Sequence, residues 1–347
     1  MFHVTRFAVA KASDREQRRR MERLIGQLEP IMSRAFRDGI DRLRGQVDVA
    51  ALADLLQRGR IVEAMGLLNA ELLARGFRPL AREIAYQAVF AGHVVARMAA
   101  ESGVLAGMSV AFGPAETEVS DWLRRYEMDK IRDLTAEALG TVRSVITNGV
   151  TEGRNPLDVA RDVRAHIGLT ERQSQAVQNY RRALENGDRA ALQRALRDRR
   201  FDGTVARSLR DAEPLSAQQV KHMVGRYEER YLRHRSETIA RTEALRAANG
   251  GADLAWRQIV GDGRIPAEAV TRTWYHSHDS KVRDSHRLIP VMNPEGVKLD
   301  EPFQSPLGPI LFPGDPAAPA ANTINCRCTV LFKVDAVMLE QAQRMAA

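Results

Sequence analysis

A chain of 347 residues can bury a sizeable core but exceeds what one core usually serves, so we expect two or three structural units. Its two cysteines, Cys326 and Cys328, exclude a disulfide framework, and a bond between them would close a very small, strained ring, so both are expected as reduced thiols. The formal net charge of +8 favours contact with a polyanion or an acidic partner surface, whereas an aromatic content of 5% argues against a stacking platform for single-stranded nucleic acid.

The N-terminal region, residues 1–165, is predicted to be helical because strong helix formers dominate it and aromatic residues are few. Its first apolar stretch is too short for a secretory signal, and its most apolar run contains His93 and Arg97, so no membrane anchor is expected. A strongly charged amphipathic helix is predicted over residues 11–43. Its apolar face would carry Leu24, Leu28, Ile31, Met32 and Ala35.

Two helix starts are clear on either side of residue 165. Asn155 can cap a helix whose first position is Pro156, a residue that suits this position because it has no backbone N–H to satisfy. The next helix begins after Thr170, which has capping-box spacing with Gln173. Both signals predict helix–turn–helix connections with short links.

The middle region, residues 166–250, is predicted to be helical and to end in the longest helix of the chain. Ser216 and Gln219 have capping-box spacing and would open this helix. We expect it to end at the pair Gly250 and Gly251, because glycine is the usual residue just past a helix end.

The C-terminal region, residues 251–347, is predicted to be a small α+β domain, so the whole chain is expected to be mainly α. Residues 271–277 and 328–334 have the β-branched and aromatic character of short strands. Between them, residues 290–325 form a long proline-rich loop, largely irregular, with one short hairpin. A short helix is predicted at the end of the chain.

Side chains that can carry chemistry concentrate in this last region. They are His276, His278, Asp279, Arg283, Asp284, His286, Cys326, Arg327 and Cys328. A zinc site would draw on His286, Cys326, Cys328 and Asp279, although one residue between two cysteines is a shorter spacing than structural zinc sites usually have.

Two other interpretations compete with zinc. Cys326 could be a thiolate activated by His286 and oriented by Asp279, but no local signature of a cysteine hydrolase surrounds it. In the third interpretation Asp279 caps a turn and the cysteines are small buried groups at a strand entrance. Residue chemistry alone favours this third interpretation, so we assign no catalytic residue and no cofactor, with zinc as the alternative.

Four segments of the chain occur together in a characteristic order. They are "ETIARTEALRAANGGADLAW", "TWYHSHDSKVRDSHRLI", "PGDP" and "INCRC". In this order they resemble the phage Mu F-like head morphogenesis family, the minor capsid proteins of tailed phages, over residues 165–333.

The resemblance implies a set of structural motif residues. They are Arg241, Thr242, Glu243, Trp274, Asp279, Arg283, His286, Asn325, Cys326, Arg327 and Cys328. In some relatives a Cys-x2-Cys pair follows the aspartate, which together with the terminal cysteines implies a bound metal. Here Arg283 and His286 stand at those two positions, a variant that implies a salt-bridged or hydrogen-bonded replacement.

Strand alternation gives an expectation for the Cys-x-Cys element. If both cysteines begin the final strand, they point to the same face, toward the segment that carries Asp279, Arg283 and His286. They would then hold the proline-rich loop against the domain. Arg327 would point the other way, where it could pair with Glu243 or contact a partner.

The resemblance also implies a structural function. We expect a minor head protein that acts in head morphogenesis inside the procapsid, near the portal and in contact with packaged DNA. Its expected main partners are the portal and major capsid proteins, and scaffold and double-stranded DNA are expected as secondary partners. The protein would be assembled in the host cytoplasm and would occupy the capsid interior in more than one copy. The alternatives are a head-resident enzyme, a nuclease or transferase, and a dedicated DNA-binding protein.

Overall fold

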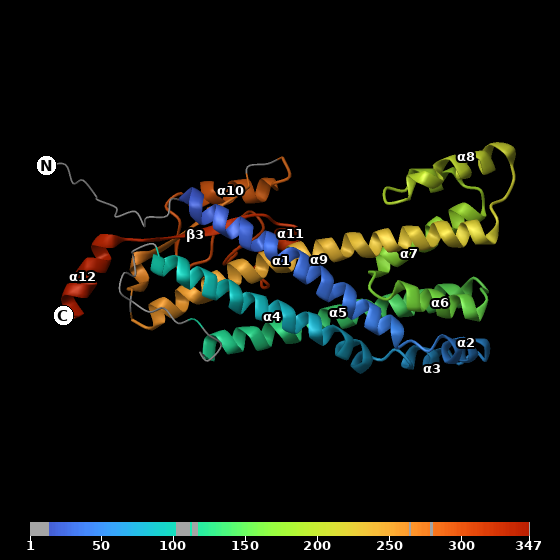
Figure 1. Cartoon of the computed structure of the whole chain (residues 1–347), viewed down its shortest axis with the longest axis horizontal. Helices are drawn as coiled ribbons and strands as arrows, with labels where there is room; N and C mark the ends of the chain where they lie inside the picture. Colours follow the sequence, from blue (N-terminus) through green and yellow to red (C-terminus); the bar gives the residue numbers. More distant parts are fainter. Residues whose placement is uncertain (1–13, 102–111, 113–116, 264, 278–279, 347) are drawn as a thin grey trace. The chain divides into compact units, whose positions relative to one another are not determined.

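The computed structural model describes residues 14–101, 112, 117–263, 265–277 and 280–346 of the chain (Figure 1). In chain order its elements are α1 (Asp14–Gly45), α2 (Val49–Gln57), α3 (Ile61–Gly66), α4 (Ala70–Glu101), α5 (Thr117–Thr151), α6 (Pro156–His166), α7 (Glu171–Glu185), α8 (Asp202–Asp211), α9 (Ala217–Gly261), β1 (Val270–Tyr275), α10 (Asp284–Met292), β2 (Val297–Lys298), α11 (Ala320–Thr323), β3 (Thr329–Val334) and α12 (Ala336–Ala346). Short 3-10 helices occupy Arg189–Gln193, Arg199–Phe201 and Ala267–Ala269.

The predicted fold class is confirmed: the protein is mainly helical, with a small antiparallel sheet in the C-terminal region (Figure 1). The strand order is β2-β1-β3, and Trp274 on β1 lies opposite Val330 on β3. The proline-rich loop contains the expected short hairpin, an antiparallel bridge between Phe303 and Ile310. It also contains α11, which the sequence did not indicate.

The predicted helix starts are also confirmed. The Asn155 side chain accepts the N–H of Leu157 at the start of α6. Thr170 and Gln173 form a complete capping box before α7. On α1, however, Ile31 is 39% exposed, so the buried stripe is different from the predicted one. It consists of Met21, Leu24, Leu28, Met32, Phe36, Ile40 and Leu43.

The predicted end of the long helix at Gly250 and Gly251 is wrong, because α9 continues to Gly261. A Cβ atom at Gly251 would lie 2.3 Å from the backbone oxygen of Ala88 on α4. The glycine is therefore needed for close helix–helix approach, and it remains in the helix because packing compensates its low helix propensity.

The chain divides into two compact units. One comprises Met1–Arg34, Ala81–Met128 and Thr238–Ala347, and the other comprises Ala35–Leu80 and Asp129–Glu237. We call them the sheet unit and the helical unit. The sequence-based boundaries at residues 165 and 250 remain predictions.

The helical unit contains a network of partly buried charged side chains. Arg181 forms two hydrogen bonds to Asp162, at 2.6 and 2.8 Å, and Arg44 pairs with Glu228 at 3.2 Å. Burial raises the pKa of Glu228 to about 7, although Arg44 opposes the shift. Burial also lowers the pKa of His166 to about 4, against the attraction of Asp162.

The sheet unit orders the proline-rich loop through one buried guanidinium, that of Arg272 on β1. This side chain has no solvent exposure and pairs with Asp253 on α9 at 3.0 Å. It also donates hydrogen bonds to backbone oxygens along the loop, those of Lys298, Glu301 and Leu311. One side chain thus ties β1, α9 and the loop together.

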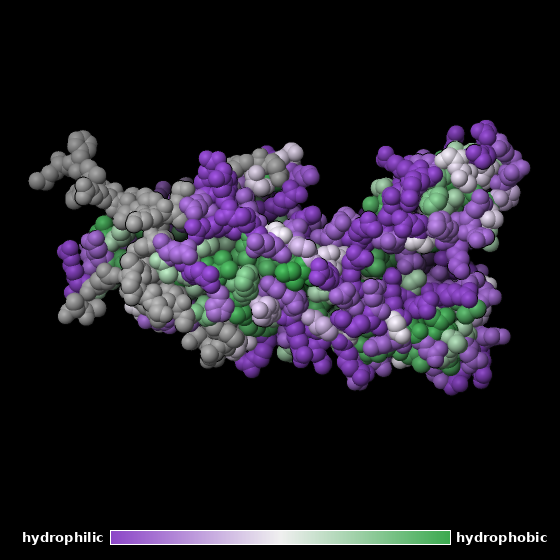
Figure 2. Space-filling model, viewed as in Figure 1, coloured by the Kyte–Doolittle hydropathy of each residue, from purple (hydrophilic) through white to green (hydrophobic). Residues whose placement is uncertain are grey.

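Figure 2 shows hydrophilic side chains over most of the visible helical surface, with smaller hydrophobic areas between them. None of the described helices combines the length and the apolar character that crossing a membrane requires.

Candidate functional site

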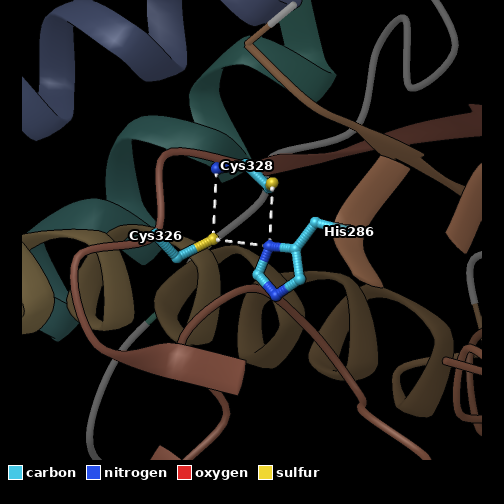
Figure 3. Close-up of side chains that lie close together, drawn as sticks. All are labelled: His286, Cys326 and Cys328. Atoms are coloured by element: carbon cyan, nitrogen blue, oxygen red, sulfur yellow. Dashed lines mark hydrogen bonds between the residues drawn. The ribbon is translucent and has the colours of Figure 1, made fainter. Parts of the chain in front are cut away.

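Three potential metal ligands meet in the sheet unit: His286, Cys326 and Cys328 (Figure 3). His286 belongs to the first turn of α10, and the two cysteines immediately precede β3. All three residues are buried, and their ligand atoms lie within 4.8 Å of one another. We call them the His-Cys-Cys cluster.

The cluster confirms the expectation that both cysteines face His286. Its Nδ1 atom lies 3.4 Å from the Sγ atoms of both Cys326 and Cys328 (Figure 3). The backbone N–H of Cys328 also donates to the Cys326 sulfur, at 3.3 Å. Asp279, the fourth predicted ligand, lies outside the described residues.

A chain of hydrogen bonds orients the imidazole of His286. The Ser305 hydroxyl donates to the backbone oxygen of Gly308 at 2.5 Å, so it accepts from the amide nitrogen of Asn322, which is 3.2 Å away. The amide oxygen of Asn322 therefore faces Nε2 of His286, at 2.9 Å, and accepts its hydrogen. This places the lone pair of Nδ1 toward the two sulfurs, as a metal ligand requires.

Trp274 on β1 supports the same ring. Its indole packs edge-to-face on His286, with ring centroids 5.5 Å apart, and on Phe303, at 5.4 Å. These contacts confine the imidazole in addition to the hydrogen bond that it donates to Asn322.

The thiols influence each other's protonation. A hydrogen bond from the Cys328 thiol lowers the pKa of Cys326 most, burial opposes it, and His286 adds to the lowering. The same hydrogen bond, together with burial, raises the pKa of Cys328. Burial lowers the pKa of His286, but its interaction with Cys326 outweighs this and the pKa is raised overall. Cys326 is therefore the thiol that ionises first.

The donor set fits zinc. In a tetrahedral site with usual Zn–N and Zn–S bond lengths, nitrogen and sulfur ligands stand about 3.5 Å apart. The two observed nitrogen–sulfur separations of 3.4 Å agree with this value. A bound zinc ion would neutralise the thiolates and link α10 to the segment before β3.

The predicted Arg-Thr-Glu element lies on α9 and holds the segment that carries the cysteines. The Thr242 hydroxyl donates to the Thr238 oxygen and accepts the backbone N–H of Asn325, at 3.2 Å. Arg241 donates to the side-chain oxygen of Asn325 at 3.4 Å. Asn325 has a φ of +56°, a left-handed conformation that asparagine tolerates better than most residues. A sharp turn therefore presents the cysteines to His286.

Residues 175–331 match the model of the family described as Phage Mu protein F like protein. This segment belongs to the phage Mu protein F-like family. The resemblance found in the sequence over residues 165–333 is thereby confirmed, and the family indicates a phage head morphogenesis protein of the virion. Comparisons with curated proteins and with solved structures gave no match.

The matched segment contains the whole His-Cys-Cys cluster and the Arg-Thr-Glu element. Glu243 is buried, pairs with Arg246 at 3.2 Å and accepts a hydrogen bond from Tyr126. Arg246 and Tyr126 both engage the Glu243 carboxylate, and the pairing of Arg327 with Glu243 stays a prediction. Arg327 is exposed.

Sequence reasoning missed two parts of the site. Asn322, which orients the imidazole, lies four residues before Cys326, but nothing in the sequence distinguishes it from a turn residue of the proline-rich loop. Arg272 sits on an alternating strand at a position that the pattern assigns to the buried face, and an arginine there could have been recognised as the centre of a buried ion pair.

Proposed function

We propose that this protein is a structural, non-enzymatic minor head protein that acts inside the procapsid near the portal and contacts packaged DNA. The portal and major capsid proteins would be its main partners, scaffold a further one, and it would occupy the capsid interior in more than one copy. The family match supports the role in head morphogenesis, and the net charge of +8 supports contact with DNA.

The observation that carries the structural role is how the motif side chains are used. Thr242 and Arg241 hold Asn325, and Glu243 forms a buried pair with Arg246. These contacts build a fixed platform from α9 and the segment before β3. An assembly protein needs such a platform because a preformed surface loses little conformational entropy on binding.

The test is reconstitution with the purified portal and major capsid proteins. The wild-type protein should co-assemble with them, and Thr242→Val should reduce incorporation because it removes the hydroxyl that accepts the Asn325 N–H. Thr204→Val on α8, which has no part in this platform, serves as the matched control. Metal-dependent nuclease or NAD-consuming activity in the wild-type protein, without binding to either partner, would favour the enzyme alternative.

We further propose that the His-Cys-Cys cluster binds one zinc ion that fastens the segment before β3 to α10. The supporting observation is that Nδ1 lies 3.4 Å from each sulfur, the separation of nitrogen and sulfur ligands on zinc, while the hydrogen bond to Asn322 fixes the imidazole on its other side. Purified protein should contain one zinc per chain, and His286→Ala and Cys326→Ser should each lose it. Metal-free wild-type protein with unreactive thiols would instead leave the cluster as buried packing.

A further inference from the structure

A cavity of about 320 Å³ adjoins the His-Cys-Cys cluster, and several cationic side chains line it. Its lining includes Arg241 on α9, Lys281 and Arg283 just before α10, and Arg327 between the two cysteines. None of the described residues that line it carries a carboxylate. Four positive side chains from three separate segments of the chain thus converge on one concave surface.

The two arginines on the inner side of this cavity are held by neutral acceptors. Arg283 donates to the backbone oxygen of Ile324, and Arg241 donates to the side-chain oxygen of Asn325. Arg241 also forms an ion pair with Glu29, at 3.8 Å, which is longer than a charge-assisted hydrogen bond. The neutral acceptors position the two guanidinium groups, and the half-exposed ion pair with Glu29 offsets the charge of Arg241 only in part.

Lys281 and Arg327 are exposed and complete the rim. The cavity also lies at the N-terminus of α10, where Arg283 is the N-cap residue and makes no side-chain capping bond. The first amides of a helix carry partial positive charge, which adds to the charge of the side chains. A concave wall of protein concentrates this potential inside the cavity.

We propose that this cavity binds a phosphate group. Guanidinium groups match phosphate oxygens geometrically, and lysine binds phosphate as a point charge. The donors approach from three segments, so they suit a tetrahedral anion with several oxygens better than the two coplanar oxygens of a carboxylate. The inference does not depend on the proposed place of the protein in the head, since free phosphate compounds and nucleic acids present the same group.

The test is a calorimetric titration of the full-length protein with inorganic phosphate, at low ionic strength and under reducing conditions. We expect saturable binding of one phosphate per chain, and a loss of affinity of about tenfold or more in the double variant Lys281→Gln/Arg327→Gln. Both side chains are exposed, so the variant should fold normally. The control is Arg143→Gln, which removes an exposed charge on α5 outside the cavity and should leave binding unchanged.

Competition then separates the sources of the phosphate. Displacement of inorganic phosphate by a short DNA duplex would support a nucleic-acid ligand, and displacement by a mononucleotide but not by the duplex would support a small one. Absence of saturable binding to the wild-type protein, or equal affinity of the double variant and Arg143→Gln, would overturn the proposal. So would a glutamate-rich peptide that binds in the cavity when phosphate does not, because the ligand would then be an acidic protein segment.

Discussion

Replacing Arg272 by methionine should loosen the proline-rich loop far more than removing a neighbouring arginine. Arg272 is wholly buried and serves Asp253 together with backbone oxygens of the loop. Methionine approximates its volume but removes this donor from the loop oxygens and leaves Asp253 with Arg257 as its remaining ion-pair partner. Breaking a buried ion pair costs about 3–5 kcal/mol, and the stranded backbone oxygens place the expected loss toward the upper end.

The matched control is Arg257→Met. Arg257 also pairs with Asp253, at 2.7 Å, but it is partly exposed, and Arg272 would still neutralise Asp253 after its removal. We expect a loss of only about 1 kcal/mol for this variant. Arg257 also contacts the loop, through Asp300 and the backbone oxygen of Leu299, so the contrast between the two arginines isolates the effect of burial.

Hydrogen exchange measures the opening of the loop directly. The amides of Phe303 and Ile310, which bond to each other's backbone oxygens, report on it. Their exchange should accelerate by more than about a hundredfold in Arg272→Met and by about tenfold or less in Arg257→Met. Equal acceleration in the two variants would refute the reasoning, since it would show that the loop does not depend on the buried guanidinium.

Three further predictions address other parts of the protein. Asn322→Ala should weaken zinc binding by about 10- to 100-fold in a competition with a chromophoric chelator, and unchanged affinity would show that the amide does not orient the imidazole. Glu228 has a folded-state pKa raised by burial to about 7, so it holds a proton that the unfolded chain has lost, and its contribution to stability falls as the pH rises from about 4.5 to about 7. Glu228→Gln should remove this decline, worth about 3 kcal/mol, in denaturant unfolding at a series of pH values, and identical pH slopes in variant and wild type would contradict it. Gly251→Ala should destabilise the sheet unit by about 1–3 kcal/mol in thermal unfolding, because the new Cβ would meet the backbone of α4. Gly261→Ala is the control and should not destabilise it, because the space around Gly261 is open. Equal melting temperatures of the two variants would disprove the packing role of Gly251.

Much of the candidate site could be predicted from the sequence because its members follow local rules. Alternation over a two-residue period placed Cys326 and Cys328 on one face, and the order of the motifs indicated His286 as their partner. The environment of the site could not be predicted in this way. Asn322 lies 36 residues from His286 along the chain, and only the folded loop brings the two together.

The sequence by itself determined the mainly helical class, the helix starts at Asn155 and Thr170, the two C-terminal strands and the family. These features depend on capping and periodicity, which act within a few residues. The tertiary structure decided that Gly251 stays inside α9 and that Arg272 fastens the loop. It also decided which cations face one cavity, because long-range packing sets which distant backbones and side chains meet, and no local pattern encodes those neighbours.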